Sequence, residues 1–214
     1  MASRLQIYNS ALRHLKSNSR LSSLSENRPA RLLLDDAWNA GAVDYCLSQA
    51  YWKFATRTVK LEPDPNITPA FGFRYAFEKP SDHLITAALT DDEYLNHPLL
   101  DYSFEQGYWY ADVDEIYLQY VSNGETYGGD LTKWSINFTQ YFELYLAYQT
   151  SGNIEGGDNA FKLIARRMKD ALSEAKSTDA MENPTKFIPQ GQWTQSRSGG
   201  SSRNDRGNKG RLIG

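Results

Sequence analysis

The sequence contains little cysteine and histidine and no long apolar run. Its 214 residues include one cysteine, Cys46, which cannot close an intrachain disulfide. Because Cys46 lies within a helical pattern, we expect a small core residue in a reduced compartment. No apolar stretch reaches the roughly 18 residues of a transmembrane helix, and the N-terminal segment lacks the apolar run of a signal peptide. We therefore expect no membrane partner, and a protein that is made in a cytoplasm and kept or assembled there.

The motifs of common catalytic devices are also missing. The sequence has no G-x-x-x-x-G-K-[ST], no G-x-G-x-x-G, no H-E-x-x-H and no G-x-S-x-G. Its three histidines, His14, His83 and His97, lie far apart without metal-ligand spacing, and Cys46 has no second cysteine with which to share a zinc ion. We therefore expect no cofactor, no metal site and no enzymatic activity.

Clusters of acidic residues keep one alternative open. Asp112, Asp114 and Glu115 offer oxygen ligands for a divalent cation, which would make the protein a metal-dependent enzyme. A short acidic link between two aromatic strands is also typical of a hairpin turn, because Asp favours turn conformations. We favour the turn, and we interpret residues 91–93 and 35–36 as a solvated loop and a polar helix face.

Aromatic residues, in contrast, are abundant. Fourteen Tyr, nine Phe and five Trp make up 13% of the chain. Side chains that are partly apolar and partly polar suit surfaces that a partner covers. This composition favours a protein that acts through its contacts.

Positive charge gathers at the C-terminus. Residues 191–214 hold five basic residues against Asp205 alone, a net charge of +4, so residues 1–190 carry −7 to give the chain's −3. The same segment contains six Gly and four Ser, and so few apolar groups cannot offset the entropy of ordering it. Regular patterning ends at Thr178, which predicts an extended tail over residues 178–214. A nucleic-acid-binding protein that acts through this basic tail is the second alternative.

One aromatic residue in the tail has the setting of a docking motif. Trp193 follows Phe187, Ile188 and Pro189 and precedes Arg197. Such a segment resembles a linear motif whose aromatic anchor fills a pocket on a protein partner. The other interpretation is that Trp193 packs back on its own domain.

Apolar spacing predicts helices at both ends of the body. They cover residues 3–16, 24–54, 135–150 and 158–177. The second is the longest, because one apolar stripe continues from Leu33 to Phe54, and Ser23 with Glu26 forms a candidate capping box ahead of it.

Between residues 56 and 123 the apolar period changes to two, which predicts a β region. The expected strands are residues 56–61, 71–77, 102–105, 108–111 and 115–121, with a short helix around 82–89. Short turn-like links separate the last three strands, which is the spacing of an antiparallel meander. The predicted fold class is α+β: a helical bundle with a projecting antiparallel β region, which together form a body over residues 1–177, and an extended C-terminal tail.

Several segments carry a resemblance by their shared order. They are residues 20–26, 33–38, 52–57, 73–82 and 117–123, then Trp134 leading into 138–147, and finally Trp193 with Arg197. Together they resemble the head-to-tail adaptors of podophages, the tail tubular protein A family, over the chain to about Arg197. His83 and Ile85 differ from the family pattern, which has an aromatic and a basic residue there.

The resemblance implies a structural connector of a short-tailed phage virion, assembled in the host cytoplasm. Such adaptors form a ring homo-oligomer, usually a dodecamer, that joins the portal protein to the tail nozzle protein. In related adaptors the helical body builds the ring, the β-rich part faces the nozzle and the tail reaches the portal. The candidate portal-binding residues are then Phe187, Ile188, Pro189, Trp193 and Arg197. DNA would pass through the channel without specific binding, since an acidic lining repels phosphates.

Overall fold

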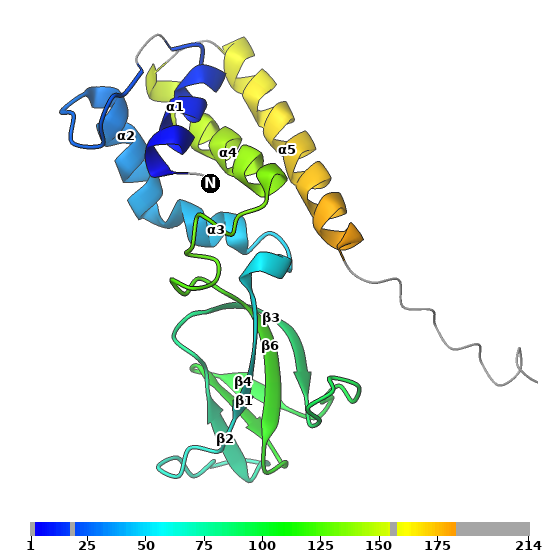
Figure 1. The fold of residues 1–214 in the computed structure, drawn as a ribbon. Helices are drawn as coiled ribbons and strands as arrows, with labels where there is room; N and C mark the ends of the chain where they lie inside the picture. The colour runs from blue at the N-terminus through cyan, green and yellow to red at the C-terminus, as the bar shows by residue number, and fades with distance from the viewer. Residues whose placement is uncertain (1–2, 18–19, 155–157, 183–214) are drawn as a thin grey trace, which may run out of the picture. The chain divides into compact units, whose positions relative to one another are not determined.

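The computed structural model describes residues 3–17, 20–154 and 158–182. It combines helices with antiparallel sheets, which confirms the predicted α+β class (Figure 1). The chain divides into two units, Met1–Glu182 and Asn183–Gly214, and the second lies outside the described residues. All of the structure discussed below belongs to the first unit.

The helices lie at the two ends of this unit's sequence. They are α1 (Arg4–His14), α2 (Pro29–Ala37), the π-helical turn η1 (Trp38–Ala42), α3 (Val43–Leu47), the 3-10 turn η2 (Lys53–Ala55), α4 (Ile136–Ile154) and α5 (Asp158–Met181). The predictions for α1, α4 and α5 are confirmed apart from their ends. Because α5 continues to Met181, the prediction that the tail begins at Thr178 is wrong. None of the described helices has both the length and the apolar composition that crossing a bilayer requires.

The prediction of one continuous helix over residues 24–54 is wrong. Helix α2 begins at Pro29, and ahead of it the Glu26 carboxylate accepts the backbone N–H groups of Ser22 and Ser23, at 2.6 and 3.1 Å, in a turn of its own. The helical path then breaks at Gly41, whose φ of 90° lies in the left-handed region that glycine adopts without a steric cost. The apolar stripe continues through this break, so periodicity alone did not reveal it.

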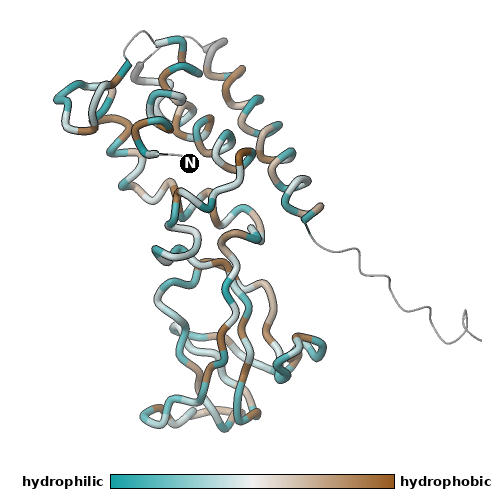
Figure 2. Tube along the Cα trace, viewed as in Figure 1, coloured by the Kyte–Doolittle hydropathy of each residue, from teal (hydrophilic) through white to brown (hydrophobic). Residues whose placement is uncertain are grey.

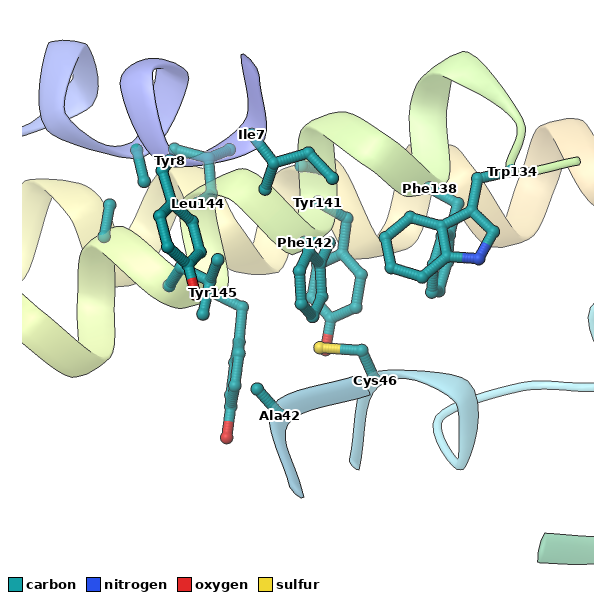
Figure 3. Close-up of a cluster of buried hydrophobic side chains, with 14 of the residues drawn as sticks. Ile7, Tyr8, Ala42, Cys46, Trp134, Phe138, Tyr141, Phe142, Leu144 and Tyr145 are labelled. Carbon is teal, nitrogen blue, oxygen red and sulfur yellow. The ribbon is translucent and has the colours of Figure 1, made fainter. Parts of the chain in front are cut away.

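The helical core brings α1, α3 and α4 together and contains several large aromatic side chains (Figure 3). Trp52 contacts Phe138 with ring centroids 4.9 Å apart. Cys46 is fully buried and lies against Tyr141, and burial raises the pKa of its thiol above the ordinary range. The prediction that Cys46 is a core residue is confirmed.

A charged network joins α1 to α2. The Tyr8 hydroxyl donates to Asp35 Oδ1 at 2.8 Å, and Arg4 Nη2 donates to the same oxygen at 2.8 Å. Arg31 pairs with the other carboxylate oxygen of Asp35. The Asp35 carboxylate therefore holds two helices together and is not only part of a solvated face.

The strands form two three-stranded antiparallel sheets. They are β1 (Thr56–Leu61), β2 (Tyr75–Glu78), β3 (His83–Thr90), β4 (Ser103–Glu105), β5 (Tyr108–Ala111) and β6 (Ile116–Ser122). The order is β1-β6-β3 in the first sheet and β2-β5-β4 in the second. A second core between them contains Phe77 and Trp109 from one sheet and Leu118 and Tyr120 from the other.

Three predictions within the β region are wrong in part. Residues 83–90 form a strand and not a helix, because β3 pairs with β6 through two irregular register shifts. β4 and β5 form the predicted hairpin, but β6 belongs to the other sheet, so the three strands are not a meander. In the predicted strand 71–77 only the residues from Tyr75 onward pair in a sheet.

The loop after β6 makes a close approach between the first sheet and the helices. The Gly128 N–H donates to the Ser122 carbonyl at 3.1 Å, and the Gly128 carbonyl accepts the indole N–H of Trp134 at 2.8 Å. A Cβ atom added at Gly128 would lie 2.4 Å from the Ser122 oxygen and 2.7 Å from Leu47 Cδ1. Only glycine fits between β6 and α3 at this point.

Hydrophobic and hydrophilic residues alternate along the length of helix α5 (Figure 2).

We predict that Gly128→Ala lowers the free energy of unfolding by about 1–3 kcal/mol, because backbone and core atoms must move to admit the methyl group. Gly152→Ala is the matched control, since a Cβ there meets nothing within 4 Å. Within helix α4 the control should gain up to about 1 kcal/mol from the higher helix propensity of alanine. Urea unfolding of both variants measures the difference, and equal stabilities would contradict the assigned close approach.

Candidate functional site

The candidate portal-binding residues cannot be placed. Phe187, Ile188, Pro189, Trp193 and Arg197 all lie outside the described residues. Candidate sites are therefore sought within residues 3–182. The acidic clusters and the exposed aromatic side chains are the features that bear on function there.

Two acids of the alternative enzyme site are engaged with the segment before β2. An Asp112 oxygen accepts the backbone N–H of Arg74 at 2.8 Å. The Asp114 carboxylate hydrogen-bonds the Tyr75 hydroxyl, which raises the pKa of Tyr75. Both carboxylates thus fix the start of β2 against the link between β5 and β6.

The third acid of this group, Glu115, faces a different strand. Its carboxylate pairs with Lys60 of β1 and accepts the Tyr117 hydroxyl at 2.8 Å. The hydrogen bond from Lys60, and next that from Tyr117, lower the pKa of Glu115. The three acids therefore have separate partners, and within the described residues they do not converge on a common point for a cation.

Another group of three ligand-type residues does converge, on the loop after β3. Oxygen and nitrogen atoms of Asp91, Asp92 and His97 lie within 4.8 Å of one another. The Asp92 carboxylate, however, accepts the backbone N–H groups of Asn96 at 3.0 Å and His97 at 2.9 Å. This is the hydrogen bonding of an Asp that closes its own loop, so we assign no metal to it.

A further carboxylate, Asp82, connects strands of the first sheet through its hydrogen bonds. It accepts hydrogen bonds from the Tyr120 hydroxyl at 2.8 Å, from Ser122 Oγ at 2.5 Å and from Arg57 at 2.7 Å. Burial alone would raise the pKa of Asp82, but the bonds from Ser122, Tyr120 and Arg57 together hold it below its ordinary value. The segment that contains Asp82, part of the family resemblance, therefore ties its own sheet together.

The neighbouring His83 is one of the two residues at which the sequence differs from the family that it resembles. Its ring stacks on Tyr120 with centroids 5.2 Å apart and meets the edge of Trp109 at 5.5 Å. Its Nε2 lies 2.9 Å from the Thr86 hydroxyl. The imidazole thus packs as an aromatic ring between the two sheets.

Aromatic side chains also pair on the helices, where Tyr45 and Phe161 are exposed and their partner Tyr145 is buried. Tyr45 stacks on Tyr145 with centroids 4.9 Å apart, and Tyr148 lies 4.9 Å from Phe161. Tyr145 and Tyr148 are three residues apart on α4, so the two pairs adjoin on one helix face. Tyr45 is 50% and Phe161 41% exposed. We call these four residues the helical aromatic surface.

A second group lies on the outer face of the β2-β5-β4 sheet. Phe71, 41% exposed, contacts Tyr110 with centroids 5.0 Å apart and Phe73 at 6.1 Å. Tyr108 lies on the same face of β5 as Tyr110, because side chains two apart on a strand share a face. We call Phe71, Phe73, Tyr108 and Tyr110 the sheet aromatic surface. The sequence shows the excess of aromatic residues. The strand register is needed to tell which of them lie on the outer face and which, like Trp109, are buried.

Comparison of the sequence with protein-family models and with curated proteins finds no match. The residues themselves therefore carry the functional argument. Within residues 3–182 the acids of the predicted clusters serve the fold, and the two aromatic surfaces are left exposed. Exposed apolar side chains that lie together are typical of surfaces that bind other macromolecules.

We predict that the His83 ring makes stability depend on pH. Burial, and next the charge of Lys79, hold the pKa of His83 below its ordinary value of 6.5. The unfolded chain therefore takes up a proton near pH 6.5 while the folded chain resists it. Stability should be greatest above that pH and decrease as the pH falls through the window below it.

His83→Phe keeps an aromatic ring and removes the titrating group, so its thermal midpoint should decrease less between pH 6.5 and pH 5 than that of the wild type. His97→Gln is the control for loss of an exposed imidazole, since the His97 side chain is 78% exposed. If the thermal midpoint of His83→Phe decreases with pH as steeply as that of the wild type, His83 is not the group responsible for the pH dependence.

Proposed function

We propose that this protein is a non-enzymatic connector of a short-tailed phage virion. In this proposal, copies of the chain form a ring that joins the portal protein to the tail nozzle protein, and DNA passes through the ring. The observation that carries it is the pair of exposed aromatic surfaces, one on the helices and one on the second sheet. The ordered resemblance to podophage head-to-tail adaptors gives the kind of assembly.

Two different surfaces are what a ring subunit needs. A head-to-tail contact uses unlike patches on neighbouring copies, and it closes into a ring when the rotation permits. The helical aromatic surface suits the contact between copies, because tyrosine and phenylalanine bury a large area at a small entropic cost. The sheet aromatic surface then remains available for the nozzle protein.

The charge distribution supports the same assignment. Residues 1–190 carry a net −7, which keeps passing DNA from adhering over most of the body. The basic tail, in contrast, contains Trp193 with Arg197, the combination of an aromatic anchor and a cation that dominates many docking contacts. In this proposal the tail meets the portal.

The first test measures the mass of the assembly. Mass photometry is performed on the protein alone and on its mixture with the portal. The mixture should contain a ring of defined mass. Tyr45→Ser with Phe161→Ser should remove the ring while the circular dichroism of the monomer stays unchanged, because both side chains are about half exposed. Ile136→Ser, at an 85% exposed residue of neither surface, is the control and should assemble normally. A wild type that never forms a ring with the portal would overturn the proposal.

The second test concerns the tail. Trp193→Ala should weaken portal binding by roughly 2 kcal/mol, about a thirtyfold change in Kd, if its ring is the anchor. Titration of labelled portal with each variant measures this change. Gln192→Ala is the neighbouring control. An unchanged Kd for Trp193→Ala would show that the docking motif is wrongly assigned, even if the ring itself forms.

A further inference from the structure

We propose that a cation-lined depression beside α1 binds the phosphate groups of a nucleic acid backbone. The depression has a volume of about 590 Å³. Its lining includes Gln6, Asn9, Ser10, Arg13, Lys16 and Arg20, with no carboxylate and no aromatic ring. This binding does not depend on the ring proposed above.

Three cations meet at this depression without an acidic partner. Other cations of the described residues also lack an ion pair, but Arg13, Lys16 and Arg20 are unpaired and line one depression together. Arg13 Nη2 donates to Ser10 Oγ at 3.2 Å, so one guanidinium is held along α1 by a neutral group. Three uncompensated positive charges at one hollow create a local positive potential on a body that is otherwise acidic.

The backbone at Lys16 gives an independent reason to assign a role to its side chain. Helix α1 ends with Leu15 as its C-cap, and Lys16 follows with a φ of 56°, in the left-handed region. The Ser17 N–H reaches back to the Leu12 carbonyl at 3.0 Å. Glycine is the usual residue at this position because it has no Cβ to clash. A lysine there is strained, and its side chain lines the depression.

The chemistry of the lining favours phosphates over other anions. Arginine, lysine, hydroxyl and amide groups are the side chains that contact phosphate and sugar oxygens. Base recognition in single strands uses aromatic stacking, and none of the lining residues is aromatic. An acidic peptide would need an apolar pocket for an anchor side chain, and the one apolar lining residue, Leu12, is 1% exposed and belongs to the core.

The binding should be independent of base sequence and sensitive to salt. Contacts to phosphates carry no sequence information, and each phosphate contact releases a condensed counterion from the nucleic acid. Because residues 1–190 carry a net charge of −7, like charges around the depression should keep the contact local and reversible. It therefore remains compatible with DNA that passes without specific binding.

The test uses the full-length protein and fluorescence anisotropy of a labelled DNA duplex of mixed sequence at several salt concentrations. Lys16→Gly removes the charge and relieves the left-handed strain, so its thermal midpoint should equal or exceed that of the wild type. Its Kd for the duplex should rise about fivefold, and the slope of log K against log salt should flatten by about 0.9. Arg20→Gln should raise the Kd and flatten the salt slope as Lys16→Gly does. Lys169→Gln, on the exposed side of α5, is the control and should leave the Kd unchanged.

Two further measurements test whether the tail is the DNA-binding site instead of the depression, and whether the depression binds an acidic protein segment instead of DNA. Arg203→Gln with Arg206→Gln removes two charges of the basic tail. If that variant alone weakens duplex binding while Lys16→Gly binds as the wild type does, the proposal is overturned in favour of the tail. If polyglutamate binds in a Lys16-dependent manner and the duplex does not, the depression takes an acidic protein segment and the phosphate assignment is wrong.

Discussion

The close approach at Gly128 is the constraint on which the rest of the structure depends. At this residue the loop after β6 runs directly against β6 itself and against Leu47 of α3, with no space for a side chain. The Gly128 carbonyl also accepts the Trp134 indole, which lies in the core at the start of α4. One glycine therefore sets the distance between the first sheet and the helices. Asp179 adds a second tie, because its carboxylate near the end of α5 accepts the Lys53 N–H at 2.9 Å just before β1.

Local sequence signals identified the elements whose stability is local. Helices α4 and α5 follow from helical spacing, and β1 begins and ends as predicted because Pro63 and the change of period bound it. Elements that depend on distant partners were not predictable. The run 83–90 contains helix formers such as Leu84 and Ala88, yet pairing with β6 makes it a strand. The left-handed Gly41 likewise looks like any other glycine until the backbone is seen.

The candidate sites show the same limit. The sequence identified Asp112, Asp114 and Glu115 as potential ligands, but the groups that engage them lie on other strands, as with Arg74 and Lys60. Residue type gives the chemistry that is available, and only tertiary structure says whether a neighbour already uses it. The αL conformation of Lys16 could not be predicted either, because most lysines after a helix end have ordinary backbone angles.

The functional proposal has its physical basis in a contrast between two kinds of side chain: carboxylates that are hydrogen-bonded within the fold, and aromatic side chains that are left exposed. Asp35, Asp82 and Glu115 are each held by two or more hydrogen-bonding partners, so protonation or metal binding there would cost the fold the contacts that they make. The helical and sheet aromatic surfaces have the opposite property, since covering Tyr45 or Phe71 removes apolar area from water and breaks no internal bond. Burial of these side chains against a partner would therefore contribute favourable free energy to association. The proposed connector function would require association alone, and association through these surfaces leaves in place the charged groups that hold the sheets and helices together.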